Sequence, residues 1–105
     1  MTTVKLKDLA KVIRSKNAGA LLVTLDVMFD DGATYQRVQA SGALAPRRLA
    51  RLYNVSENEI AVTPFDVALA IKITLPRPVV AGSPGDTDVY GAQQHAPLMD
   101  IEIAP

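Results

Sequence analysis

Cysteine is absent from the 105-residue chain, and histidine occurs only once. The lack of cysteine excludes disulfides and thiolate metal sites, which fits a reducing compartment. No stretch approaches the ~20 apolar residues of a membrane helix, and the lysine-containing start lacks the apolar core of a signal peptide. We therefore expect a cytoplasmic protein that contacts no membrane.

Net charge is also absent, because eleven Lys and Arg residues balance eleven Asp and Glu residues. A neutral chain lacks the basic surplus of a DNA-binding domain. Residues 49–56 resemble the first helix and turn of a helix-turn-helix, but strand-like residues 59–64 follow them, so no recognition helix is predicted. No nucleic-acid partner is expected.

The balanced charge is unevenly placed along the chain. Residues 1–58 carry nine basic and five acidic residues, whereas residues 59–105 carry two and six. The two ends of one domain could attract each other weakly, or a polarised surface could bind a charged partner. The sequence leaves both interpretations open.

Three helices are predicted from apolar spacing and capping residues. Their ranges are 8–16, 32–40 and 46–53. The first shows apolar residues at i, i+3, i+4 and i+7, the spacing of one helix face. Asp31 can cap the second helix and Gly42 can end it. The third begins at a proline, a favoured first residue, and its Leu49, Leu52 and Tyr53 should face the core.

Four strands are predicted from alternating apolar positions. Their ranges are 21–29, 59–65, 68–75 and 98–103. One face of the first strand carries Leu21, Val23, Leu25, Val27 and Phe29. A short helical turn at residues 66–70 is an alternative start for the third strand. These elements predict a single α+β domain over residues 1–105, with a mixed sheet of about four strands and two or three helices on one face.

Residues 76–97 form a long segment without helical or strand period before the last strand. They hold four of the seven prolines, three of the six glycines and the only histidine. Loops longer than about 12–15 residues are uncommon in compact domains and are usually functional or disordered. Because Tyr90 and the run Gln93, Gln94 and His95 can pack and hydrogen-bond, we expect an ordered loop that carries function.

Asp86, Asp88 and His95 are the candidate catalytic residues of this loop. Two carboxylates two residues apart can meet one cation, and a histidine can carry a proton near neutral pH. One histidine and two aspartates are a thin ligand set for a metal, and aspartates in glycine-rich turns often bond backbone amides instead. The sequence therefore names no metal and no cofactor.

The candidate binding residues supply cations, carboxylate, hydroxyls and amides. They are Arg14, Asn17, Asp26, Arg77, Ser83, Tyr90, Gln93 and Gln94. Arg14 and Asn17 fall between the first helix and the first strand, where they could hold a carboxylate or phosphate oxygen or form an ordinary basic helix end. Asp26 lies mid-strand, where aspartate is disfavoured, so it faces solvent, pairs with Arg14 or Arg77, or joins a site.

Residues 12–19 (Val-Ile-Arg-Ser-Lys-Asn-Ala-Gly), the strand end at 25–30, and residues 75–78 with 82–97 resemble one family. It is a small domain of unknown function that occurs alone or fused behind AtuA-type acyclic terpene utilisation proteins of bacteria. The resemblance covers nearly the whole chain. It implies a companion subunit in bacterial breakdown of branched or hydroxy carboxylates, with CoA thioesters as one form, and assigns no catalytic residue.

We expect an accessory subunit that docks on a large AtuA-type protein and contributes residues 76–97 to an interface or shared active site. Tyr90 and Arg77 belong to residue types that are enriched at binding hot spots.

An alternative is a small homo-oligomeric lyase or hydratase that acts on a carboxylate substrate. His95 would then move the proton, Asp86 or Asp88 would assist or hold a metal, and Arg14 or Arg77 would bind the carboxylate. A carboxylate or an acyl-CoA is a possible small-molecule partner in either case. A ligand-sensing module is a third interpretation.

Overall fold

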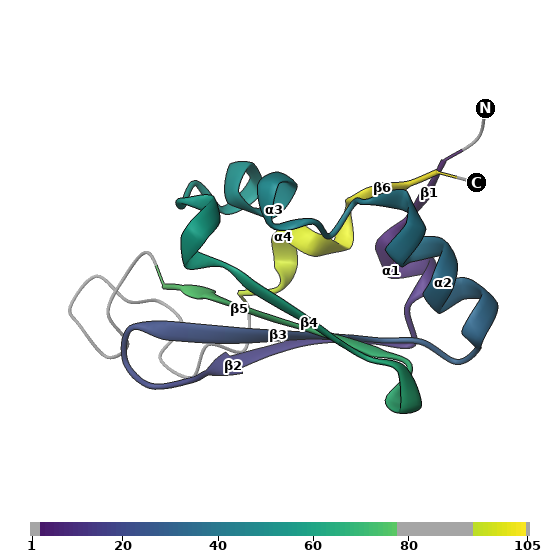
Figure 1. Ribbon diagram of the computed structural model, residues 1–105, viewed down its shortest axis with the longest axis horizontal. Helices are drawn as coiled ribbons and strands as arrows, with labels where there is room; N and C mark the ends of the chain where they lie inside the picture. Colours follow the sequence, from purple (N-terminus) through teal and green to yellow (C-terminus); the bar gives the residue numbers. More distant parts are fainter. Residues whose placement is uncertain (1–2, 78–93, 105) are drawn as a thin grey trace.

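A four-stranded antiparallel sheet carries the helices on one face (Figure 1). The computed structural model describes residues 3–77 and 94–104. The strand order is β2-β3-β5-β4, with β2 at Val12–Asn17, β3 at Leu22–Met28, β4 at Ala61–Phe65 and β5 at Ala70–Pro76. A separate pair joins β1 (Val4–Lys5) to β6 (Glu102–Ile103), so the two ends of the domain meet. The α+β prediction is confirmed.

The described helices are short, and α2 begins and ends at recognisable signals. They are α1 (Leu6–Leu9), α2 (Gly32–Ser41), α3 (Pro46–Tyr53), α4 (Ala96–Met99), and the 3-10 turns η1 (Glu57–Glu59) and η2 (Asp66–Ala68). Asp31 caps α2 by accepting the Thr34 N–H at 2.7 Å, and Gly42 ends it at a φ of 71°, a conformation that favours glycine. None of these helices is long and apolar enough to cross a bilayer.

The core lies between the helices and the inner face of the sheet. Alternate strand residues point to this face, as the pleat requires. The central strands contribute Val23, Leu25, Val27, Ile71, Ile73 and Leu75, and the helices contribute Leu6, Tyr35, Val38, Leu49 and Leu98. The outer face carries the Arg14, Asp26 and Lys72 row, and no described helix covers it.

The helix predicted at residues 8–16 is wrong. Only Leu6–Leu9 is helical, and Val12–Asn17 forms strand β2. Val12 and Ile13 are β-branched and so favour a strand, and the whole segment pairs with β3 from Val12 opposite Met28 to Asn17 opposite Val23. This tertiary pairing outweighs the local helical spacing.

The last predicted strand, residues 98–103, is correct only at its end. Leu98 belongs to α4, where Pro97 occupies the first turn, a position that suits proline. The third strand begins later than predicted, and the alternative helical turn is confirmed as η2. The sheet is antiparallel in every described pairing rather than mixed.

Leu52, predicted to face the core, does not, because it is 41% exposed. Leu21, predicted to share a strand face with Val23, lies just outside β3 and is 64% exposed. Leu49 is fully buried and Tyr53 packs against the core, as predicted.

Candidate functional site

Arg77 and Asn17 meet at one end of the sheet, on its inner face. Arg77 follows β5, and its backbone N–H donates to the Leu21 carbonyl at 2.9 Å, which continues the pairing with the chain before β3. Its side chain is turned inward, so the residue is only 8% exposed. Nη1 donates to the Asn17 Oδ1 at 2.8 Å. The guanidinium is therefore held in a fixed orientation beside β2.

Ser15 and His95 meet on the same face. Ser15 lies two residues before Asn17 in β2, so both side chains point to the same side of the sheet. The Ser15 Oγ lies 3.3 Å from the His95 Nδ1, and the residues are 80 positions apart in sequence. Depending on the imidazole tautomer, either the hydroxyl or Nδ1–H donates. Ser15 is buried and His95 is half-buried.

Tyr53, the last residue of α3, fixes the chain that leads into α4. Its hydroxyl donates to the Gln94 carbonyl at 2.9 Å, and burial raises the pKa of Tyr53 far above its ordinary value. We call this group of side chains the polar cluster; it consists of Ser15, Asn17, Tyr53, Arg77 and His95. The cluster thus holds both chain segments that border residues 78–93.

The polar cluster contains the groups needed for proton transfer and anion recognition. Imidazole and hydroxyl in contact can pass a proton, and a guanidinium offers a two-pronged donor to a carboxylate. The described residues contain no group of three His, Cys, Asp or Glu side chains that could bind a metal.

The structure divides the candidate residues predicted from sequence into two groups. Asn17, Arg77, Gln94 and His95 come together at the polar cluster. Arg14 and Asp26 lie on the opposite, outer face, where Nε and Oδ2 are 3.3 Å apart. The Arg14 pairing is one of those predicted for Asp26. Ser83, Asp86, Asp88, Tyr90 and Gln93 lie outside the described residues.

Sequence reasoning missed Ser15 as a site residue and treated Tyr53 as a core residue only. Once residues 12–17 are read as a strand, Ser15 and Asn17 fall on one face, and this alternation is the signal that the predicted helix concealed. Tyr53 gave no comparable signal, because the contact between its hydroxyl and Gln94 depends on tertiary structure.

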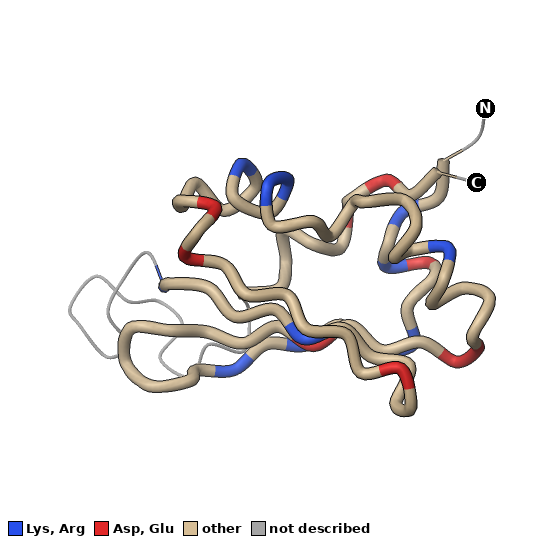
Figure 2. The backbone as a smooth tube through the Cα atoms, in the orientation of Figure 1, with Lys and Arg blue, Asp and Glu red and all other residues tan. Residues whose placement is uncertain are grey.

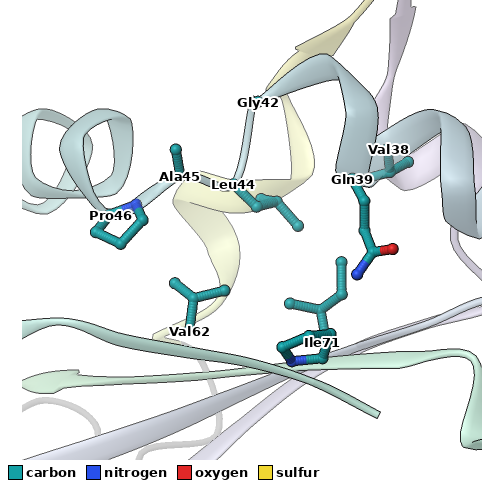
Figure 3. A pocket seen from close by; sticks show the side chains of 9 residues that line it. Val38, Gln39, Gly42, Leu44, Ala45, Pro46, Val62 and Ile71 are labelled. Atoms are coloured by element: carbon teal, nitrogen blue, oxygen red, sulfur yellow. The ribbon is translucent and has the colours of Figure 1, made fainter. Parts of the chain in front are cut away.

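A separate hollow lies between the α2–α3 connection and the sheet edge (Figure 3). Its volume is about 310 Å³, and aliphatic side chains such as Val38, Leu44, Val62 and Ile71 line it. Gln39 supplies the amide seen among them in Figure 3. Among the predicted site residues that the structure describes, none lines this hollow.

The fold and the polar cluster define a small α+β domain whose inner sheet face ends in a histidine, a serine and a buried arginine. The chain belongs to a family described as a domain of unknown function, DUF4387, whose model matches residues 6–102. No curated protein matches the chain, and no solved structure matches it.

Proposed function

We propose that this chain is a cytoplasmic accessory subunit of a large AtuA-type protein. The proposed role is in bacterial catabolism of branched or hydroxy carboxylates, with CoA thioesters among the candidate substrates. The subunit would contribute residues 76–97 to an interface or to a shared active site. The family resemblance motivates the choice of partner.

The observation that supports this proposal is the anchoring of both borders of residues 78–93 at one end of the sheet. Arg77 is held by the Leu21 carbonyl and by Asn17. On the other border, Gln94 and His95 are held by Tyr53 and Ser15. Fixed borders reduce the conformational entropy that an interface segment loses on binding.

Exposed apolar side chains lie beside these anchors. Leu21 is 64% exposed and Leu22 is 40% exposed, and the Leu21 carbonyl accepts the Arg77 N–H. Single exposed leucines are ordinary on protein surfaces. An exposed leucine beside Arg77 gives the apolar and polar mixture found at the centres of protein interfaces.

The test is the solution mass of this chain, alone and co-expressed with an AtuA-type protein, by size exclusion with light scattering. Leu21→Asp should weaken or abolish the mixed complex, because it places a charge in the apolar part of the interface. Val67→Asp is the matched control, since Val67 is fully exposed in η2, at the opposite end of β5. Tyr90→Ala should weaken association by about 1 kcal/mol or more. Absence of a mixed complex with the wild-type chain would refute the proposal.

A small homo-oligomeric lyase or hydratase is the second candidate function. The Ser15 and His95 contact favours it, because the pair can move a proton on the sheet face to which Arg77 also turns. In this case the chain alone should form a defined oligomer and turn over branched or hydroxy carboxylates or their CoA thioesters. His95→Ala should abolish turnover, whereas Lys72→Gln, on the outer face, should retain it. Loss of a bound metal in Asp88→Ala would add a metal to this mechanism.

A further inference from the structure

Three arginines share the solvent-facing side of helix α3. Arg47, Arg48 and Arg51 line a hollow of about 250 Å³ on the surface. The blue segments on α3 in Figure 2 mark the basic positions of this helix. At 3.6 residues per turn the three positions fall within about 100° of arc. Leu49, which is fully buried, lies on the opposite side of the helix. The three guanidinium groups are therefore gathered on one face.

No acidic side chain neutralises this cluster among the described residues. The four ion pairs found there use Lys5, Lys7, Lys11 and Arg14 as the cations. The acidic turn η1 follows α3, yet neither of its glutamates lies within ion-pair distance of an arginine. Like charges one turn apart on a helix repel each other. The cluster is thus a local cost to folding.

The position of the arginines within the helix adds to this cost. Arg47 and Arg48 occupy the first turn of α3, where the helix dipole favours anions and disfavours cations. The N-cap residue is Ala45, whose side chain supplies no capping hydrogen bond. The Arg47 backbone N–H has no hydrogen-bond partner in the described part of the chain. An anion at this place would satisfy the dipole, the N–H and the arginines together.

We propose that Arg47, Arg48 and Arg51 form a binding site for the phosphate group of a ligand. Arginine forks match phosphate oxygens in pairs, and a helix N-terminus adds a backbone donor and a favourable dipole. The site faces away from the core and shares no residue with the polar cluster. The inference is therefore independent of the proposed function.

The test is calorimetric titration of the full chain with inorganic pyrophosphate and with ADP, at constant ionic strength. Arg47→Gln and Arg51→Gln each remove one guanidinium group and should weaken the binding of pyrophosphate about tenfold or more. Arg51→Lys should also bind more weakly than wild type, because it keeps the charge and loses the fork. Lys72→Gln is the matched control for the loss of one exposed cation and should bind as wild type does.

A second measurement guards against misfolded variants. Arg48→Glu should raise the melting temperature of the free protein by about 2–4 °C, because it places an anion in the first turn. The same variant should lose the rise in melting temperature that pyrophosphate causes in the wild type. A stabilised variant that has lost binding cannot be explained by unfolding.

Two further arms identify the source of the phosphate. Binding of pyrophosphate or ADP supports a soluble ligand. Sedimentation of the protein with phosphatidic acid vesicles, but not with phosphatidylcholine vesicles, supports a lipid headgroup. Either result supports the phosphate site. Equal binding of citrate overturns the phosphate assignment. Equal loss of binding in Lys72→Gln, or no binding of any phosphate probe, overturns the site itself.

Discussion

Replacing Tyr53 with phenylalanine tests whether the polar cluster fixes the chain that enters α4. The change removes one oxygen and keeps the ring, so packing against the core is preserved. It deletes the 2.9 Å hydrogen bond from the hydroxyl to the Gln94 carbonyl. That bond ties the C-terminal end of α3 to the border of residues 78–93.

The expected cost follows from the environment of the two groups. A hydrogen bond between neutral partners contributes a net ~0.5–1.5 kcal/mol to the free energy of unfolding. Gln94 is half-buried, so water can reach part of the carbonyl once the hydroxyl is gone, which keeps the cost near the middle of this range. A loss of about 1 kcal/mol corresponds to a fall in melting temperature of about 4–6 °C for a domain of this size.

Urea unfolding gives the free energy, and hydrogen exchange locates the effect. The Leu98 N–H donates to the His95 carbonyl at 2.9 Å in the first turn of α4. Its exchange should accelerate more than that of amides in β3, because local opening needs only the border to detach. Unchanged stability, with Leu98 exchange equal to wild type, would show that the Tyr53 contact does not anchor this segment.

Three further predictions concern charge and protonation. Burial, with the hydrogen bond to Asp66, raises the pKa of Tyr35 to about 12. The contribution of Tyr35 to stability is therefore present below the ordinary tyrosine pKa of about 10 and is lost as pH rises toward 12. Tyr35→Phe should flatten the fall in unfolding free energy between about pH 10 and about pH 12. The Thr34 backbone N–H lowers the pKa of Asp31. The ionised Asp31 side chain therefore stabilises α2 at pH values above the ordinary aspartate pKa, and this effect is lost as the pH falls through the lowered pKa. Asp31→Ala should lower the melting temperature more at neutral pH than in acid. Arg14→Gln should change the unfolding free energy by less than about 1 kcal/mol, because the ion pair of Arg14 with Asp26 is exposed. Arg77→Gln removes a buried charged donor and should lower the unfolding free energy by about 1.5–3 kcal/mol in the same urea assay.

The parts of the fold that could be predicted are those with local signals. The Asp31 cap, the Gly42 end and the proline at the start of α3 each fix a helix boundary, and the structure confirms them. The alternation of Val23, Leu25 and Val27 likewise predicts β3 and its buried face. In these segments local preference and tertiary packing agree.

The prediction was wrong where local preference and tertiary packing disagree. The apolar spacing of Leu6, Leu9 and Ile13 fits a helix, but the chain leaves the helix at Ala10 and Ile13 enters the sheet opposite Val27. This error concealed the shared face of Ser15 and Asn17. The contacts of the candidate site join residues far apart in sequence, such as Ser15 with His95, and spacing carries no information about such pairs.

Some of the basic side chains in the first half of the sequence form ion pairs in the structure, and others do not. Lys5 and Lys7 both contact Asp100, with Nζ to Oδ1 distances of 3.4 and 3.8 Å, so the basic start and acidic end of the chain attract each other where β1 pairs with β6. These contacts are exposed, and each contributes about 0–1 kcal/mol. They support the first of the two interpretations for the chain ends. The second, a surface suited to a charged partner, applies to α3, because residues 47, 48 and 51 concentrate positive charge that no described carboxylate balances.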